Sequence, residues 1–247
     1  MAMLKNNIKR ILTSCGYAIS RIQKPCNAEY FNLTKFLNYY LERNGECFLV
    51  QIGANDGVTF DPIREFIIGN PGRVRGVLLE PMKDAYSKLV ENYKDFPGII
   101  MENLAIHNKL KEMTLYKVDP EKRCQLEKWS GGMASFSSTH HELSHTPKEF
   151  IIEEKVKCVS FAELIARHNV QKIDLLQMDT EGYDAEIINA IDFSRIKPSV
   201  LRFEHGYMDR IMDKDKLQAI MKLLNDNGYQ VIVESYDATA YQPFSFI

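Results

Sequence analysis

Short apolar runs alternate with segments of helical periodicity along most of the chain. Several of the apolar runs are nearly continuous, as expected of strands buried on both faces of a sheet. We expect strands at residues 47–52, 75–79, 98–104, 114–118, 155–159, 172–178, 199–203 and 229–235, followed by one last extended segment. Helices are expected at residues 32–43, 62–68, 82–93, 161–168, 185–191 and 214–227. This alternation predicts parallel βαβ units and therefore an α/β fold, with a doubly wound, mostly parallel sheet and helices on both faces.

Residues 1–24 precede this alternation and differ from it in character. Their apolar side chains recur at helical spacing, and the segment contains basic residues but no acidic one. The pattern predicts a basic amphipathic helix that either packs on the domain or makes peripheral contact with a membrane surface. We therefore divide the chain into an N-terminal helical extension, residues 1–44, and an α/β domain, residues 45–247.

Residues 119–150 interrupt the regular pattern. They contain a pair of glycines, several serines, and the histidines His140, His141 and His145. A long irregular stretch of this kind predicts an insertion or a lid over the functional site. The spacing of the three histidines does not match a metal site, so we expect a solvated loop there and assign no metal ligand.

The composition narrows the class of protein. Apolar side chains make up 45% of the 247 residues and charged ones 26%, which is typical of a soluble globular protein. The formal net charge of −2 argues against a nucleic-acid-binding protein, which usually carries a basic excess. The five cysteines include no CxxC pair, so neither a disulfide framework nor a thiolate zinc site is expected. A reducing, cytoplasmic location is the simplest interpretation.

Polar residues follow several of the expected strands, at the point where each strand ends. They are the GANDG loop at residues 53–57, Glu80, Asn103, Asp179, Glu181, Glu204 and His205. Ligands of doubly wound sheets bind at the carboxyl ends of the strands, where these residues would meet. The sequence therefore predicts one functional site at this edge of the sheet.

The GANDG loop and Glu80 together favour a cofactor that carries a nucleoside. Gly53 and Gly57 permit a tight turn and a close approach of the backbone to a ligand. An acid at the end of the second strand accepts hydrogen bonds from the two hydroxyls of a ribose. The loop lacks the GxGxxG spacing of a dinucleotide site, which weakens the alternative of an NAD-dependent oxidoreductase.

Four sequence motifs resemble those of the FkbM family of S-adenosylmethionine-dependent methyltransferases. They are VQIGANDG at residues 50–57, LEP at 79–81, NLAI at 103–106 and IDLLQMDTEG at 173–182, and the resemblance extends over residues 48–241. It implies the Rossmann-like fold of class I methyltransferases, S-adenosyl-L-methionine as cofactor, and O-methylation of a natural product or a glycan hydroxyl. The segments DPIR at residues 61–64, MASF at 133–136 and RFEH at 202–205 resemble the branch associated with polysaccharides and glycans.

The resemblance also implies roles for individual residues. Glu80 would hold the ribose hydroxyls, and Asn103 and Ala105 would border the adenine. Asp179 would lie close to the methionine amino group or to the transferring methyl. The methionine part of the cofactor would be wrapped by Gly53, Asn55, Asp56 and Gly57.

One position departs from the family pattern. Many members carry an acid where this chain has Gln51, two residues before the first glycine. A neutral amide accepts a hydrogen bond from an ammonium group but provides no charge pairing. Gln51 is still expected to contact the cofactor, with a weaker interaction.

A hydroxyl acceptor is a poor nucleophile, so its methylation benefits from a general base. His205 is the first candidate, because a free imidazole has a pKa near ~6.5 and accepts a proton at physiological pH. Asp179 and Glu181 are the second candidates, and the structural alternatives are a histidine bonded to a loop carbonyl and an acid at a helix N-terminus. Another alternative is that Asp179, Glu181 and Glu204 hold Mg²⁺. Finally, the domain could be a non-catalytic cofactor-binding module of a glycan-assembly complex.

Overall fold

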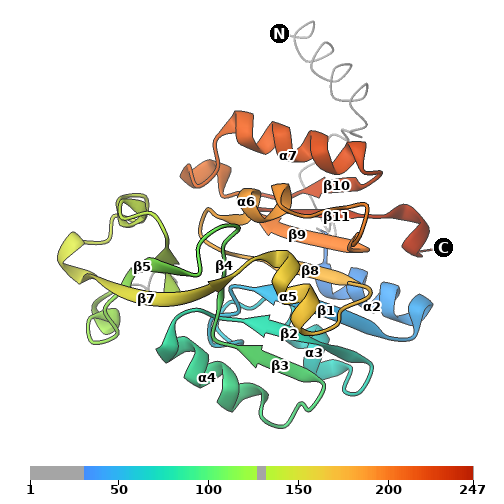
Figure 1. The fold of residues 1–247 in the computed structure, drawn as a ribbon, viewed down its shortest axis with the longest axis horizontal. Helices are drawn as coiled ribbons and strands as arrows, with labels where there is room; N and C mark the ends of the chain where they lie inside the picture. The colour runs from blue at the N-terminus through green and yellow to red at the C-terminus, as the bar shows by residue number, and fades with distance from the viewer. Residues whose placement is uncertain (1–30, 127–131, 247) are drawn as a thin grey trace, which may run out of the picture.

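The computed structural model describes residues 31–126 and 132–246, so the predicted helix over residues 1–24 lies outside the described residues. The described chain forms a central sheet of seven strands in the order β10-β11-β9-β8-β1-β2-β3 (Figure 1). The strands are β1 (Cys47–Ile52), β2 (Val74–Leu79), β3 (Ile99–Glu102), β8 (Leu175–Met178), β9 (Val200–Glu204), β10 (Gln230–Val233) and β11 (Asp237–Tyr241).

Strand direction confirms the mostly parallel sheet. β9, β8, β1, β2 and β3 are parallel neighbours, whereas β11 pairs antiparallel with both β9 and β10. The last extended segment of the chain is therefore β11, which is inserted between two strands that precede it in the sequence. Its place in the sheet is set by the short β10–β11 turn, because such a turn forces the chain to run back beside β10.

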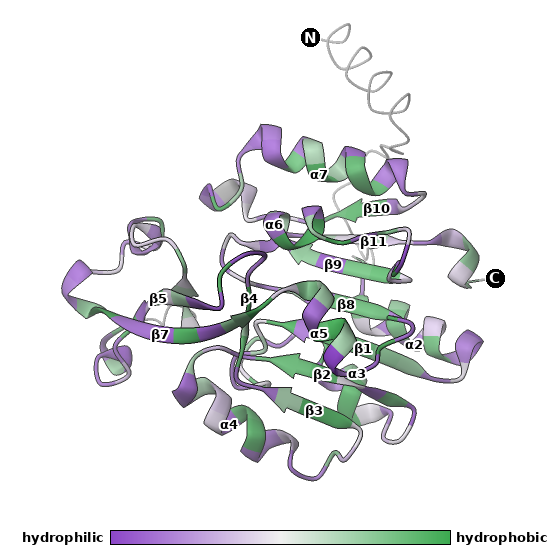
Figure 2. Cartoon of the chain, in the orientation of Figure 1, coloured by the Kyte–Doolittle hydropathy of each residue, from purple (hydrophilic) through white to green (hydrophobic). Residues whose placement is uncertain are grey.

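Helices cover both faces of this sheet, as predicted. They are α2 (Leu33–Asn44), α3 (Arg64–Gly69), α4 (Lys83–Tyr93), α5 (Phe161–Arg167), α6 (Asp184–Asn189) and α7 (Lys214–Asp226). The apolar core is split accordingly, with α5, α6 and α7 packed on one face and α2, α3 and α4 on the other. Along β1, Val50 and Ile52 enter the first core while Cys47 and Leu49 enter the second, because successive side chains of a strand point to opposite faces. Figure 2 shows the resulting hydrophobic strands between helices with polar outer surfaces.

The helix α2 is the described part of the predicted N-terminal extension. Asn32 caps its first turn by accepting the Lys35 N–H, and Gly45 ends it with a φ of 82°. Its buried side chains belong to the same core as β1 and β2. The Tyr40 hydroxyl donates a 2.5 Å hydrogen bond to the Asp174 carboxylate beside β8, so α2 is bonded directly to the α/β domain.

Four further strands form a second sheet beside the carboxyl edge of the first (Figure 1). They are β4 (Ala105–Ile106), β5 (Glu112–Val118), β6 (Ala134–Ser135) and β7 (Ile151–Val159), in the order β4-β7-β5-β6. The strands expected at residues 114–118 and 155–159 thus pair with each other, antiparallel, and not with the central sheet. The local pattern predicts that each is a strand but does not specify its partner. Within the described ranges, no helix is long and apolar enough to cross a membrane.

Candidate functional site

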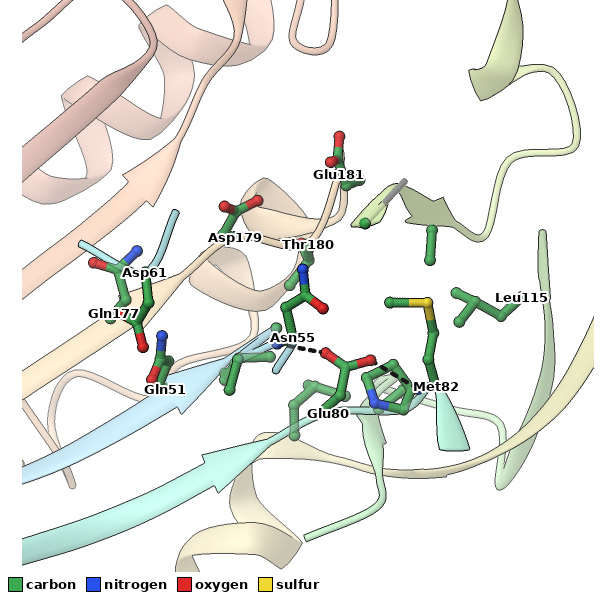
Figure 3. A pocket seen from close by; sticks show the side chains of 18 of the residues that line it. Gln51, Asn55, Asp61, Glu80, Met82, Leu115, Gln177, Asp179, Thr180 and Glu181 are labelled. Carbon is green, nitrogen blue, oxygen red and sulfur yellow. Dashed lines mark hydrogen bonds between the residues drawn. The ribbon is translucent and has the colours of Figure 1, made fainter. Parts of the chain in front are cut away.

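The cavity of interest lies at the carboxyl ends of β1, β2 and β8. The chain leaves β1 toward β2 on one side, whereas β8 flanks β1 on the other side, so the order of strands reverses at this point. Such a reversal leaves a crevice above the sheet, which is where doubly wound proteins bind their ligands. Residues from the loops after these strands, from β4 and β5, and from residues 132–136 line the cavity (Figure 3).

The glycine loop begins with a close approach between β1 and β8. A Cβ atom on Gly53 would lie 1.8 Å from the carbonyl oxygen of Asp179, and Gly53 has a φ of 85°, so no other residue fits without moving the strands. Asn55, with a φ of 50°, continues the turn and lines the cavity. The prediction that Gly53 and Asn55 border the site is therefore consistent with the geometry.

The second half of the loop has a different role from the one expected. The Asp56 carboxylate accepts the backbone N–H groups of Val58 and Thr59 at 2.9 and 2.7 Å, which turns it away from the cavity. Gly57 packs against α4, because an added Cβ would lie 2.5 Å from the Tyr93 ring. Neither residue lines the cavity. Asp56 and Gly57 therefore shape the loop and lie outside the lining of the cavity.

Glu80 is buried at the centre of the cavity wall, with 2% of its surface exposed. One carboxylate oxygen accepts the Asn55 N–H at 2.8 Å and the other accepts the Met82 N–H at 2.8 Å (Figure 3). Burial raises the pKa of Glu80 to about 7, although both hydrogen bonds oppose the shift. Each carboxylate oxygen has a second lone pair, so Glu80 retains the capacity to accept bonds from a diol.

The wall beyond Glu80 is apolar and matches an aromatic base. It is formed by Met82, Leu104, Ala105, Ile106 and Leu115. Ala105 thus lines the cavity, and its contact with an adenine, which the resemblance implies, stays a prediction. Asn103 does not line this wall, because its amide donates to the carbonyl oxygens of Glu80 and Pro81, at 2.9 Å each, and so holds the end of β2.

Two acidic residues follow β8 on the opposite side of the cavity. Asp179 lines it with an exposed side chain, and its pKa is raised well above the usual value by desolvation among the surrounding protein atoms and by the nearby charges of Glu181 and Asp184. Glu181 also lines the cavity, with a φ of 52° that is unusual for a residue other than glycine. Its carboxylate meets the His140 Nε2 at 3.0 Å, and its carbonyl oxygen accepts the Ser135 hydroxyl at 3.0 Å.

His140 is the residue of this group that the sequence analysis missed. It was assigned to a solvated loop, yet its side chain is only 10% exposed and is paired with Glu181. The two residues are 41 positions apart, so no local spacing relates them. The described part of residues 119–150 therefore contributes to the site, through Gly132, Ala134 and Phe136 in the cavity wall as well as through His140.

The structure does not bring His205 to the cavity. Its backbone N–H donates to the Tyr236 carbonyl, which buries the ring against the β10–β11 turn with 3% of its surface exposed. The Nδ1 atom accepts the Tyr207 N–H at 3.2 Å, so the histidine is bonded within its own loop, although its partner is a backbone N–H and not the loop carbonyl of the structural alternative. The expectation of a rim position fails because Gly206, with a φ of 45°, turns the chain immediately after β9.

A metal site is not formed by the acidic residues at this edge. Glu204 does not line the cavity, and burial, together with the charge of Asp179, strongly raises the pKa of its carboxyl group. In the part of the chain that the structure describes, no three His, Cys, Asp or Glu side chains are arranged to hold a metal ion. The alternative in which Asp179, Glu181 and Glu204 bind Mg²⁺ therefore has no geometric support.

The remaining end of the cavity contains three polar side chains. Gln51 of β1 and Gln177 of β8 are paired across the two strands, and Asp61 joins them from the loop before α3 (Figure 3). Gln51 was predicted from the sequence. Gln177 could have been recognised as a polar position in a buried strand, whereas Asp61 lies in the DPIR segment quoted above, which gave it no role in the site.

The donors and acceptors of the cavity fit S-adenosylmethionine. An apolar wall is available for the adenine, and Glu80 lies beside it for the ribose. The described lining residues include the carboxylates of Asp61, Glu80, Asp179 and Glu181 and no lysine, arginine or histidine. This set favours a ligand with cationic groups and disfavours the pyrophosphate of a dinucleotide.

The comparisons with known proteins agree with this assignment. A family model described as "Methyltransferase FkbM domain" matches residues 51–231. Among curated protein sequences, none is significantly similar to the chain.

Solved structures with a similar arrangement of elements share little sequence with it. The FkbM methyltransferase from Methylobacillus flagellatus KT is 14% identical, with a TM-score of 0.45, over 82% of this chain and 48% of that one. An O-methyltransferase from Bacillus cereus in complex with SAH is 10% identical, with a TM-score of 0.44, over 96% and 90% of the two chains. A precorrin-6y C5,15-methyltransferase from Geobacter metallireducens GS-15 is 13% identical, with a TM-score of 0.40, over 88% and 93%.

The family model covers most of the chain, and the motifs it includes build the cavity described above. The protein therefore belongs to the FkbM family of methyltransferases, with the class I methyltransferase fold and S-adenosylmethionine as its cofactor.

Proposed function

We propose that this enzyme methylates a hydroxyl group of a sugar, a glycan or a related natural product. The observation that carries the proposal is the position of Glu181. Glu181 lines the cofactor cavity and also lines a second, adjoining hollow. A group at that boundary is able to contact an acceptor while the acceptor faces the cofactor.

The second hollow has the composition of a site for a hydroxylated ligand. Its lining includes the hydroxyl groups of Ser137 and Thr139 and the aromatic rings of Phe136 and Tyr183. The Tyr183 ring stacks on His107 at 5.5 Å and meets Phe136 edge-on at 5.3 Å, so it is held in place by its neighbours. A rigid aromatic ring with adjacent hydroxyl groups is well suited to the apolar face and the polar edges of a sugar.

Glu181 is the base that this geometry favours. S-adenosylmethionine supplies the electrophilic methyl group, so the protein has to orient the acceptor oxygen, exclude water and accept the hydroxyl proton. One Glu181 oxygen is paired with His140, which fixes the carboxylate, and the other oxygen is available to accept that proton. The strained backbone of Glu181 supports this role, because such conformations are held in place mainly at functional sites.

The test is transfer of isotope-labelled methyl from S-adenosylmethionine to extracted glycans and lipids, with mass spectrometry to locate the labelled atom. We expect the label on oxygen. Glu181→Gln should lower the transfer rate by about 10²–10⁴-fold, a far larger change than the one in cofactor affinity. Glu142→Gln removes an exposed carboxylate from the same hollow and is the matched control, with a near-normal rate expected.

Three outcomes would contradict the proposal. Label on nitrogen or carbon would exclude O-methylation. Tight binding of S-adenosylhomocysteine without transfer to any acceptor would favour the non-catalytic module, and binding of NADH alone would favour the oxidoreductase. A normal rate for Glu181→Gln would leave O-methylation in place but exclude Glu181 as its base.

A further inference from the structure

Three buried oxygen atoms at one end of the cofactor cavity have no hydrogen-bond donor. They are Oε1 of Gln51, Oε1 of Gln177 and Oδ2 of Asp61, and all three residues line the cavity. A buried acceptor without a donor costs roughly 1–3 kcal/mol, so such atoms are rarely left unpaired in a native protein. Three of them at one place indicate a ligand that brings several N–H groups.

Neighbouring contacts fix the direction in which these oxygens point. The Gln177 amide nitrogen donates to the Met178 carbonyl at 3.1 Å, which fixes the amide and leaves its oxygen without a donor. The other oxygen of Asp61 accepts the Ile63 N–H at 2.9 Å, so Oδ2 is the free one. Gln51 and Gln177 are register partners on adjacent strands, and the Gln51 side chain forms a hydrogen bond with Asp61.

We propose that this end of the cavity is a binding site for a primary ammonium group, namely the amino group of the methionine part of S-adenosylmethionine. Asp61 supplies the negative charge, and the oxygens of Gln51 and Gln177 accept the remaining N–H groups. An ammonium group has three donors and no acceptor, which matches three acceptor oxygens and one formal charge. The inference rests on the cofactor and not on the identity of the methyl acceptor.

The same arrangement accounts for the departure at Gln51. A carboxylate at position 51 would be a register partner of Gln177 and would lie against Asp61, which would place two negative charges together in a buried region. Such a pair is unfavourable, because one of the carboxyl groups would be forced to remain protonated. With glutamine at position 51, the charge comes from Asp61, which stands ten positions further along the chain.

The electrostatic surroundings of Asp61 are consistent with a cationic ligand. Burial raises its pKa, whereas hydrogen bonds from the Ile63 N–H and from Gln51 and the guanidinium of Arg64 lower it. The Arg64 guanidinium has other partners, because it donates a hydrogen bond to the Gly57 carbonyl at 3.0 Å and packs on the Tyr93 ring. The Oδ2 atom of Asp61 thus has no hydrogen-bond partner among the described residues.

Binding measurements with two adenosine thioethers test the inference without any need for activity. S-adenosylhomocysteine carries the amino group but no sulfonium, whereas 5′-methylthioadenosine lacks the amino acid part altogether. Asp61→Asn should lower the affinity for S-adenosylhomocysteine by at least about 10-fold, which corresponds to the loss of one charge-assisted hydrogen bond. Its affinity for 5′-methylthioadenosine should change less than about twofold.

Two further variants sharpen the comparison. Gln51→Glu in the Asp61→Asn background returns one carboxylate to the same end of the cavity, and we expect it to restore most of the affinity for S-adenosylhomocysteine. Glu65→Gln removes an exposed carboxylate from the neighbouring helix α3 and should change neither affinity. Rescue by a carboxylate at a different position would not follow from a merely structural role of Asp61.

Equal losses for both thioethers, or no loss for either, would overturn the inference while leaving the cofactor assignment intact. Failure of the wild-type protein to bind either compound would overturn the cofactor assignment and the inference with it. If Asp61→Asn does not fold, the wild-type protein still decides the matter. It should bind S-adenosylhomocysteine at least about 10-fold more tightly than the analogue in which hydrogen replaces the amino group, and equal affinities would refute the ammonium site.

Discussion

Replacing Glu80 by glutamine should stabilise the free protein at alkaline pH although it removes a residue of the cofactor site. Glu80 is buried in the cavity wall, and its pKa is raised from 4.5 to about 7. The folded protein therefore binds the Glu80 proton more tightly than the unfolded chain does. The stabilisation by this proton is present below pH 4.5 and is lost as the pH rises through about 7.

The magnitude follows from the size of this rise. One pKa unit corresponds to about 1.36 kcal/mol, so ionisation of Glu80 lowers the free energy of unfolding by about 3 kcal/mol between pH 4.5 and pH 8. Glutamine does not titrate and keeps one oxygen for the Asn55 or the Met82 N–H, at the cost of the other hydrogen bond, about 1 kcal/mol. We therefore expect the variant to be slightly less stable than wild type at pH 5 and about 2 kcal/mol more stable at pH 8.

Urea denaturation of both proteins at pH 5, 6, 7 and 8 measures this difference directly. Asp184, whose pKa is also raised to about 7, titrates in both proteins and cancels in the comparison. Glu91→Gln, an exposed carboxylate on α4, is the control and should give a difference that does not depend on pH. Parallel stability curves for wild type and Glu80→Gln would refute the assignment of a raised pKa to Glu80.

The affinity for the cofactor should fall in the same variant. Glu80→Gln should bind the cofactor about 10-fold more weakly, or worse, at pH 8, because the amide offers the ribose diol fewer acceptors.

Three other predictions follow from the site. Gly53→Ala should destabilise the protein by about 2–5 kcal/mol in thermal denaturation, because the added Cβ would meet the Asp179 carbonyl. Gly45 has a similar positive φ but open space around it, so Gly45→Ala is the control and should cost only about 1–2 kcal/mol. His205→Ala should change the methylation rate less than about 10-fold while lowering the melting temperature, since the ring is buried away from the cavity; a larger loss of rate at unchanged cofactor affinity would return His205 to the role of base. Amide hydrogen exchange at residues 132–142 should slow when S-adenosylhomocysteine binds, because this segment lines the cavity and contacts Glu181, and equal protection in both states would identify a static insertion.

The sequence by itself determined which segments are strands and helices and where the site lies. The apolar runs of β1, β2 and β8 are local patterns, and each is buried on both faces in the structure. Gly53 and Glu80 were also predictable, because a glycine turn and an acid after successive parallel strands fall at the same edge of any such sheet.

Only the tertiary structure decided which side chains meet at that edge. His140 and Glu181 come from segments 41 positions apart, and the pairing of Gln51 with Gln177 depends on β8 lying beside β1. His205 shows the converse, because its place after an apolar strand was correct while the turn at Gly206 and the contact with Tyr236 direct it away from the cavity. Hydrophobic periodicity reports which face of an element is buried, but it carries no information about the partner that buries it, and catalytic and binding groups depend on that partner.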